Sequence, residues 1–217
     1  HGLANALWAA AGSGAALILM ADPNPFALRW PQALALLERE RATLFPGVPL
    51  MFETLARAPR RGDLCALRLC FSAGTALPER TFRAFLERYG IAVRQLYGCT
   101  EAGSISLDLD PDVETNGGSV GRPLPGIEIA VRDCNGTALP TGQSGDILVK
   151  SPAAASGYLG GDESSRGTFR DGWLATGDQG WLDAAGRLHI AGRKGLMLQV
   201  AGHKVYRDLF DLTDEAE

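Results

Sequence analysis

Up to about residue 97, the apolar and polar positions follow two alternating patterns. Residues 30–41 and 78–89 carry apolar side chains at helical spacing with charges on the opposite face, and Pro78 suits the start of a helix. Residues 16–20 and 67–72 are short apolar runs of the kind found in buried strands. This alternation predicts an α/β fold in which a mostly parallel sheet is flanked by helices.

Beyond about residue 117 the pattern changes, and glycine and proline recur at short intervals. Strand-like segments at 127–132 and 145–150 are separated by turn residues. We therefore expect three parts along the chain: an α/β part over residues 1–116, a small β-rich, barrel-like subdomain over 117–191, and a last part over 192–217.

The first twenty residues are apolar enough to suggest a signal peptide or a membrane span. They have no basic n-region, however, and Asn5 and the Gly-Ser-Gly at 12–14 interrupt the apolar run. The segment therefore predicts a helix, a turn and a strand.

Composition narrows the classes of partner. The 217 residues are 46% hydrophobic and 21% charged, which suits a globular chain with a substantial core. A net charge of −4, a pI near 5.5 and scattered arginines argue against binding to nucleic acid or to an anionic membrane surface. The four cysteines have no paired CxxC spacing, which favours reduced thiols in a cytoplasmic protein over a zinc site or a disulfide framework.

The strongest chemical signal is QLYGCTEAG at residues 95–103. Tyr97 offers a flat face for a purine, and Gly98 lets the backbone come close to a ligand. Thr100 supplies a hydroxyl for a phosphate oxygen, and Glu101 supplies a carboxylate for Mg²⁺. This combination predicts a nucleotide site.

Two shorter signals follow in order, TGD at 176–178 and GRKG at 192–195. Asp178 is suited to accept hydrogen bonds from ribose hydroxyls, and Arg193 is suited to assist it. Together with the first segment, they complete the set of groups that a nucleotide requires.

Five segments in this order resemble the adenylate-forming, or AMP-binding, superfamily of acyl-CoA synthetases, luciferases and peptide-synthetase adenylation domains. They are SAGTALP (72–78), YGCTE (97–101), GSVGRPLPG (118–126), SGYL (156–159), and TGD together with GRKG. Each is too short to be specific alone, but together they cover nearly the whole chain. The resemblance implies that a carboxylate attacks the α-phosphorus of ATP with Mg²⁺ present, giving an acyl-adenylate and pyrophosphate, and that the thiol of coenzyme A then displaces AMP.

The resemblance also assigns roles to individual residues. Glu101 resembles the Mg²⁺ ligand, Thr100 the phosphate contact, and Tyr97 the aromatic residue against adenine. Asp178 and Arg193 resemble the pair that binds ribose.

Other positions match less central parts of the family pattern. Gly74 and Thr75 match the segment after a strand that lines both the adenine and the acyl pocket. His1, followed by Gly2 and Leu3, resembles the histidine of an HxxGL-type segment that borders the acyl site. Gly195 stands at the hinge before the C-terminal domain, where many relatives carry Asp or Lys.

Complete members of the superfamily are more than twice as long as this chain. Nothing here matches their phosphate loop or the lysine late in their C-terminal domain. The resemblance therefore implies a fragment, with residues 192–217 as the hinge and the start of a truncated C-terminal domain. Alone, we expect such a chain to bind adenylate weakly and not to complete the reaction.

Within the superfamily, TLFPGVPLMFETLAR (43–57) resembles acyl-CoA synthetases, in which a Gly-Val-Pro turn opens a helix. The sequence thus favours part of a ligase for a fatty or aromatic carboxylic acid. Two alternatives remain open: an amino-acid adenylation domain of a peptide synthetase, and a non-catalytic nucleotide-binding remnant. The second is favoured by Gly195 and by the departures Arg207 and Leu209 in VYRDLFD.

Overall fold

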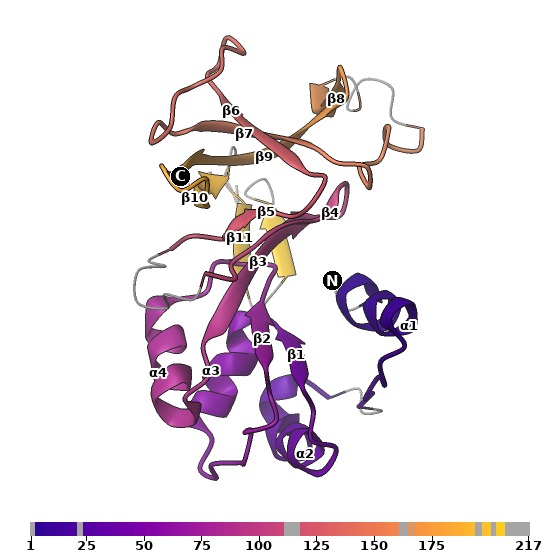
Figure 1. Ribbon diagram of the computed structural model, residues 1–217, viewed down its shortest axis with the longest axis vertical. Helices are drawn as coiled ribbons and strands as arrows, with labels where there is room; N and C mark the ends of the chain where they lie inside the picture. The colour runs from indigo at the N-terminus through magenta and orange to yellow at the C-terminus, as the bar shows by residue number, and fades with distance from the viewer. Residues whose placement is uncertain are drawn as a thin grey trace, which may run out of the picture.

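The computed structural model describes residues 3–20, 24–110, 118–160, 165, 167–193, 197–200 and 203–206. Figure 1 shows its helices and strands. The helices are the π-helix η1 (Leu3–Trp8) and the α-helices α1 (Ala9–Ser13), α2 (Phe26–Arg39), α3 (Pro49–Arg57) and α4 (Glu79–Tyr89). The strands are β1 (Leu44–Gly47), β2 (Leu69–Ser72), β3 (Val93–Cys99), β4 (Gly103–Leu107), β5 (Arg122–Pro123), β6 (Glu128–Arg132), β7 (Gly145–Lys150), β8 (Phe169–Arg170), β9 (Trp173–Leu182), β10 (Leu188–Arg193), β11 (Met197–Val200) and β12 (His203–Tyr206).

The first sheet has the strand order β1-β2-β3-β4-β5. Strands β1, β2 and β3 run parallel, with Leu44 opposite Leu69 and Cys70 opposite Val93. This part confirms the predicted parallel sheet. Strands β4 and β5 then continue the sheet in antiparallel orientation, so the complete sheet is mixed.

Local sequence explains most helix limits. Helix α3 begins at Pro49, as the Gly-Val-Pro turn predicts, because proline suits the first turn of a helix. Helix α4 begins directly after Pro78 and ends at Gly90, whose φ of 70° is the left-handed conformation that glycine adopts readily. The helix predicted at 30–41 is also present, but α2 begins at Phe26 and includes Pro31.

The core of the first part lies between α2, α3, α4 and the parallel strands (Figure 1). Leu34, Phe52, Leu55 and Phe85 are fully buried there. The rings of Phe52 and Phe85 meet edge to face with centroids 5.3 Å apart. This packing fixes the strands whose carboxyl ends carry the predicted nucleotide segments.

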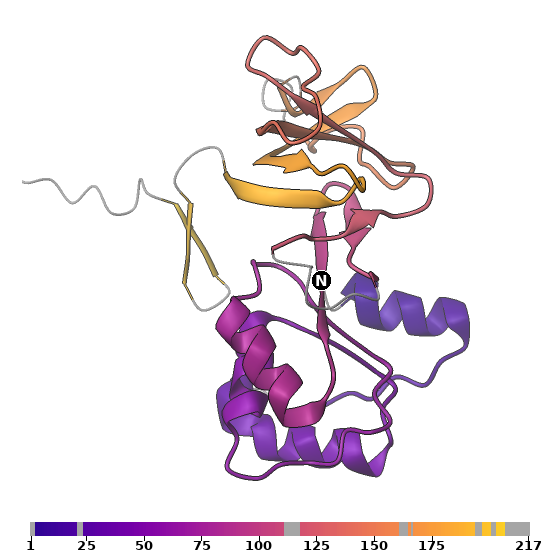
Figure 2. The same cartoon turned by 60° about the vertical axis from the view of Figure 1, so that its left-hand side comes forward.

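The strand predicted at residues 16–20 is wrong. The backbone there forms no strand, and the residues Ile18 and Leu19 are 40% and 75% exposed. An apolar run becomes a strand only where a neighbouring strand offers hydrogen bonds, and no described segment pairs with this one. In Figures 1 and 2, the preceding η1–α1 segment stands away from the three helices that cover the sheet. No helix in the described ranges has the length and hydropathy needed to cross a bilayer.

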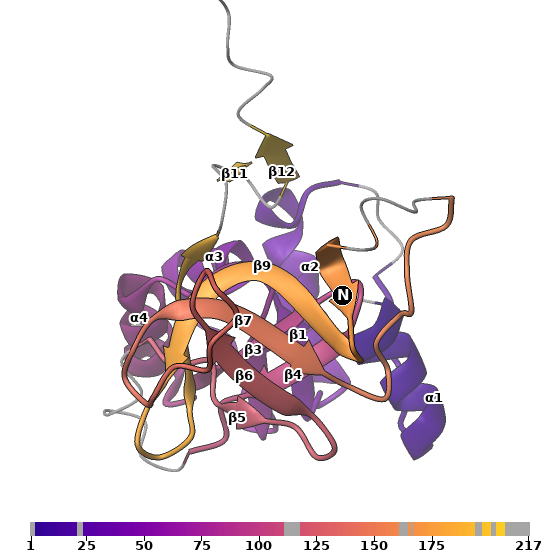
Figure 3. The same ribbon diagram turned by 90° about the horizontal axis from the view of Figure 1, so that it is seen from above.

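The second sheet is antiparallel, with the order β10-β9-β7-β6 and with β8 paired to β9. It confirms the predicted strands at 127–132, as β6, and at 145–150, as β7. Seen from above in Figure 3, β9 curves across this sheet. Its core includes residues of β4 and of the turn before it, since Ile105 and Ala102 are buried together with Ile147, Leu174 and Leu188.

Residues 119–121 connect the two sheets. Val120 N–H donates to Leu188 O, and Leu188 N–H donates to Gly121 O, each at 2.8 Å. Ser119 Oγ donates to Leu188 O at 3.2 Å and accepts from Gly121 N–H at 3.0 Å. Gly121 has a φ of 84°, and a Cβ at this position would overlap the backbone of Leu107 and Asp108. The connection therefore requires glycine.

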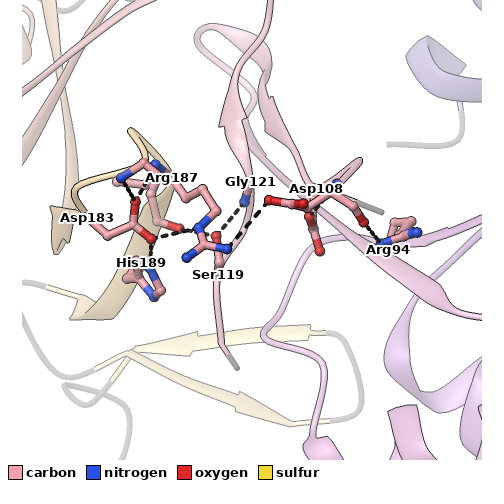
Figure 4. A network of polar contacts seen from close by, with 10 residues as sticks. Arg94, Asp108, Ser119, Gly121, Asp183, Arg187 and His189 are labelled. Carbon is pink, nitrogen blue, oxygen red and sulfur yellow. Dashed lines mark hydrogen bonds and ion pairs between the residues drawn. The ribbon is translucent and has the colours of Figure 1, made fainter. Parts of the chain in front are cut away.

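A polar network joins the β9–β10 hairpin to the first sheet (Figure 4). Arg187 Nε contacts Asp183 Oδ2 at 2.7 Å, and its Nη1 contacts Asp110 Oδ2 at 3.5 Å. Arg94 Nη1 donates to Asp110 O at 2.6 Å. The ring of His189 lies 3.1 Å from Asp183 and stacks on that of Trp181.

The network lowers the pKa of Asp183. Partial burial alone would raise this pKa, but hydrogen bonds from the backbone and side chain of Arg187, and then from His189, outweigh it and favour the charged form. Asp183 therefore stabilises the fold most where its carboxylate is ionised.

We predict that Gly121→Ala destabilises the chain more than Gly136→Ala does. Gly136 has nearly the same φ, 83°, but a Cβ there meets nothing within 4 Å. The control should cost about 1–2 kcal/mol for its left-handed backbone, and Gly121→Ala about 1–3 kcal/mol more for the overlap. Urea unfolding measures both. Equal costs would mean that Gly121 does not lie against β4.

Asp183→Asn should lower the free energy of unfolding at neutral pH. Its difference in stability from the wild type should become smaller below about pH 3.8, the ordinary pKa of an aspartate carboxyl. Because the folded-state pKa is depressed, the stabilisation is present above the unfolded pKa and is lost as pH falls through the lower folded one. Asp133→Asn is a matched control, since Asp133 Oδ1 also accepts two backbone N–H groups in a hairpin turn. Thermal melts between pH 2 and pH 8 test this. A difference that does not vary with pH would rule out the ion pair as its source.

Candidate nucleotide site

The candidate site lies at the carboxyl ends of the parallel strands, where open α/β sheets commonly bind ligands. Gly74 and Thr75 are exposed in the loop that follows β2. Gly74 has a φ of 90°, and a Cβ there would have only Val48 in contact range, at 4.0 Å. Its backbone conformation, more than crowding by the protein itself, therefore accounts for glycine at this position.

Three predicted site residues from separate strands meet. Tyr97 Oη, on β3, donates a hydrogen bond to Asp178 Oδ2, on β9, at 2.7 Å. Arg193 Nε, on β10, lies 3.7 Å from Asp178 Oδ1. The side chain of Asp178 is 15% exposed, whereas that of Arg193 is 40% exposed. The carboxylate is thus held between a phenol and a guanidinium at the edge of the protein.

The pKa of Tyr97 is raised well above its ordinary value. Burial of the phenol is the main cause, followed by the neighbouring carboxylate of Asp178. Tyr97 therefore stays protonated at neutral pH and remains a donor to Asp178.

The strands that carry these residues are irregular at the site. In the pairing of β7 with β9, Asp146 lies opposite Gln179 and Leu148 opposite Ala175, so the TGD segment bulges opposite Ile147. The β3–β4 pairing shifts register between Tyr97 and Gly98, and the β10–β9 pairing shifts before Arg193. Bulges of this kind re-aim side chains and occur often beside active sites.

Thr176 holds the bulge in place. Its side chain is buried, and its hydroxyl donates to Ile147 O at 3.0 Å while accepting from Asp178 N–H at 3.1 Å. Gly177 follows with a φ of 76°. The TGD segment therefore places the Asp178 carboxylate by a buried hydroxyl and a left-handed glycine.

Gly98 has a structural role that its sequence context did not reveal. A Cβ at this position would overlap the carbonyl oxygen of Gly103 on the neighbouring strand β4. Contact between strands therefore requires glycine here, whatever ligand approaches. Burial raises the pKa of the adjacent Cys99 to about 11, so its thiol is protonated at neutral pH.

Glu101 lies in the turn between β3 and β4, between exposed Thr100 and fully buried Ala102. Tyr158 Oη donates to Glu101 Oε1 at 2.9 Å, and Ala155 N–H donates to Glu101 O at 2.8 Å. Neither contact was predicted from the sequence. The segment SGYL drew attention to Tyr158, but no spacing rule links residues so far apart.

The donor set around Glu101 fits a magnesium ion that arrives with a nucleotide. Within the described ranges, no group of three or more His, Cys, Asp or Glu side chains is arranged to hold a metal by itself. Mg²⁺ usually binds proteins through one or two carboxylates and completes its shell with substrate phosphates and water. A single half-buried carboxylate such as that of Glu101 meets this requirement.

Gln95 is another residue to which the sequence gave no role. Its side-chain Oε1 accepts from Leu77 N–H at 3.1 Å, and its Nε2 donates to Ser119 O at 2.9 Å. It thereby ties the loop that carries Gly74 and Thr75 to β3 and to the connector at 119–121.

The structure gives no test of the remaining predicted positions. His1 and Gly195, with Arg207 and Leu209, lie outside the described residues. A cavity of about 360 Å³ opens elsewhere, on the turn between β6 and β7, and contains none of the predicted site residues.

Comparison with known proteins identifies relatives of the chain as a whole. The family model described as AMP-binding enzyme matches residues 1–159. The chain is 34% identical over 173 residues to an indoleacetate–CoA ligase of Aromatoleum aromaticum. The aligned region covers 78% of this chain and 34% of that protein. It is 32% identical over 207 residues to a benzoate–CoA ligase of Thauera aromatica, covering 93% and 38% respectively.

A solved structure is also similar. The anthranilate CoA ligase AuaEII, in complex with anthranoyl-AMP, superimposes with a TM-score of 0.75 and 35% sequence identity over 88% of this chain and 37% of that one. The chain thus spans little more than a third of the length of these relatives. With a family model matching most of its length and relatives of this similarity, the chain belongs to the AMP-binding enzyme family of adenylate-forming ligases.

Proposed function

We propose that this chain forms the nucleotide-binding part of a longer ATP-dependent ligase, which converts a fatty or aromatic carboxylic acid into its CoA thioester through an acyl-adenylate. The observation that carries the proposal is the convergence of Tyr97, Asp178 and Arg193 on one point from three strands. Relatives named as ligases for indoleacetate, benzoate and long-chain fatty acids support the choice of substrate class.

In this proposal Asp178 accepts hydrogen bonds from the ribose hydroxyls. Its carboxylate is already oriented by Tyr97 and Arg193, so little ordering is needed when the nucleotide binds. The ring of Tyr97 provides the surface against adenine, while its hydroxyl remains engaged with Asp178. Arg193 reaches the ribose from the more exposed side.

The turn after β3 binds the phosphates of the nucleotide. The hydroxyl of Thr100 donates to a phosphate oxygen, and Glu101 holds Mg²⁺, which neutralises phosphate charge when bound. The reacting carboxylate oxygen attacks the α-phosphorus and pyrophosphate leaves; the CoA thiol then attacks the acyl carbon and AMP leaves. The protein contributes position and charge to both steps more than any nucleophile of its own.

On the family pattern, Gly74 and Thr75 line both the adenine and the acyl pocket. Their position after β2, which pairs with β3, supports this assignment. We assign His1 to the acyl pocket and Gly195 to a hinge on the family pattern alone, since both lie outside the described residues.

The proposal is tested by measuring carboxylate-dependent pyrophosphate release from the full-length ligase over fatty, aromatic, dicarboxylic and amino acids, with and without CoA. Release with a fatty or aromatic acid, followed by its CoA thioester, is the expected result. Release with amino acids and no thioester would replace it with the peptide-synthetase alternative. If a folded protein that still binds ATP released no pyrophosphate with any of these acids, a non-catalytic remnant would be favoured.

We predict that Glu101→Gln lowers the rate of pyrophosphate release by at least about 100-fold, because loss of even an outer-shell partner of a metal typically costs 10- to 100-fold. Glu128→Gln is the matched control, since Glu128 is an exposed strand residue whose carboxylate lies 3.7 Å from Lys150. An unchanged rate in Glu101→Gln would remove Glu101 from the metal site.

Asp178→Asn should weaken AMP binding about 10- to 100-fold, the range expected for lost hydrogen bonds to a charged group. Comparison with 2′,3′-dideoxy-AMP makes the test specific to ribose. The wild-type protein should prefer AMP over the dideoxy analogue, and the variant should lose that preference. Calorimetry measures all four affinities. If the variant still distinguished the two ligands, Asp178 would not be the ribose contact.

A further inference from the structure

The segment at 151–160, which contains the SGYL motif, contacts the predicted metal ligand twice. Ala155 N–H donates to the backbone oxygen of Glu101 at 2.8 Å, and Tyr158 Oη donates to its carboxylate Oε1 at 2.9 Å. One contact fixes the main chain of the turn and the other fixes the side chain. The proposed function gives no role to this segment.

Tyr158 is held by contacts at both of its ends. Its N–H donates to Ser165 Oγ at 2.8 Å. Its ring meets that of Phe169 edge to face, with centroids 5.3 Å apart, and Phe169 packs against the core of the second sheet. The phenol therefore approaches Glu101 from a fixed direction, although Tyr158 is 42% exposed.

A hydrogen bond to one oxygen of a carboxylate fixes the orientation of the whole group, and so fixes where its second oxygen points. Hydrogen bonds from a hydroxyl to a charged acceptor are among the stronger ones in proteins. Carboxylates that bind metals are commonly oriented in this way by outer-shell donors. At Glu101, the neighbouring Ala102 is fully buried, so the turn itself has little freedom to compensate.

We propose that Tyr158 is a positioning residue, whose hydroxyl orients the Glu101 carboxylate for the metal complex of the nucleotide. The inference rests on the proposed function, because it takes Glu101 as the metal ligand. Tyr158 touches neither substrate nor metal in this account and acts through Glu101. The segment at 151–160 thereby determines the geometry of a residue in the turn between β3 and β4.

The test measures the affinity of the full-length ligase for the Mn²⁺ complex of a non-hydrolysable ATP analogue, and separately for metal-free AMP. Tyr158→Phe should weaken binding of the metal complex about tenfold, the lower end of the effect of outer-shell substitutions. It should leave AMP affinity and the melting temperature unchanged, because the ring and its packing remain.

Tyr89→Phe is the matched control. It removes one phenolic hydroxyl, which donates to Leu55 O at 3.1 Å on the helical side of the first sheet. This variant should bind the metal complex as the wild type does. Glu101→Gln is the second reference and should weaken binding of the metal complex without affecting AMP.

The outcomes separate the inference from the function on which it rests. If Glu101→Gln weakens the metal complex but Tyr158→Phe binds it as well as, or better than, the wild type, the positioning role is wrong and the metal assignment stands. If Tyr158→Phe weakens AMP equally, its role is general packing, and the inference is overturned. If Glu101→Gln has no effect, the metal assignment fails and the inference fails with it.

Discussion

The hydrogen bond between Tyr97 and Asp178 is the contact on which the candidate site depends. It joins residues 81 positions apart, one on the mixed sheet and one on the curled antiparallel sheet. Burial and the adjacent carboxylate keep the phenol protonated, so the donor persists at physiological pH. A site that spans two sheets requires such a fixed link, because small relative shifts would separate its halves.

That link is possible only because the backbone is irregular on both sides of it. Regular strands would place side chains alternately on opposite faces. The bulge at TGD, supported by Thr176, and the register shift after Tyr97 interrupt this alternation. Farther from the site, Gly121 and the pairing of Arg187 with Asp110 hold the second sheet against the first. The irregular positions thus coincide with those of the candidate site residues.

The spacing of apolar residues and the turn residues predicted the helices and strands whose limits are set by nearby sequence. The helix after Pro78 and the strand at Gly145–Lys150 follow from periodicity and from turn residues. The helix after the Gly-Val-Pro turn was expected from the family resemblance. The strand expected at 16–20 failed because strand formation depends on a partner that no local pattern contains. The antiparallel continuation of the first sheet by β4 escaped prediction for the same reason.

For the candidate site, the sequence predicted which residues lie together better than it predicted how they are held. Motif order identified Tyr97, Asp178 and Arg193 together, and the structure brings them into contact. The contact of Tyr158 with Glu101 could not be predicted, because it joins residues 57 positions apart through a turn and a loop. The role of Gly98 was visible only once its neighbour Gly103 was known.

The most direct test of this account is a crystal structure of the full-length protein with AMP bound. The account predicts that adenine lies against the ring of Tyr97 and that a ribose hydroxyl donates to Asp178, with Arg193 beside it. AMP bound elsewhere, with the Tyr97–Asp178 pair facing away from it, would contradict the account.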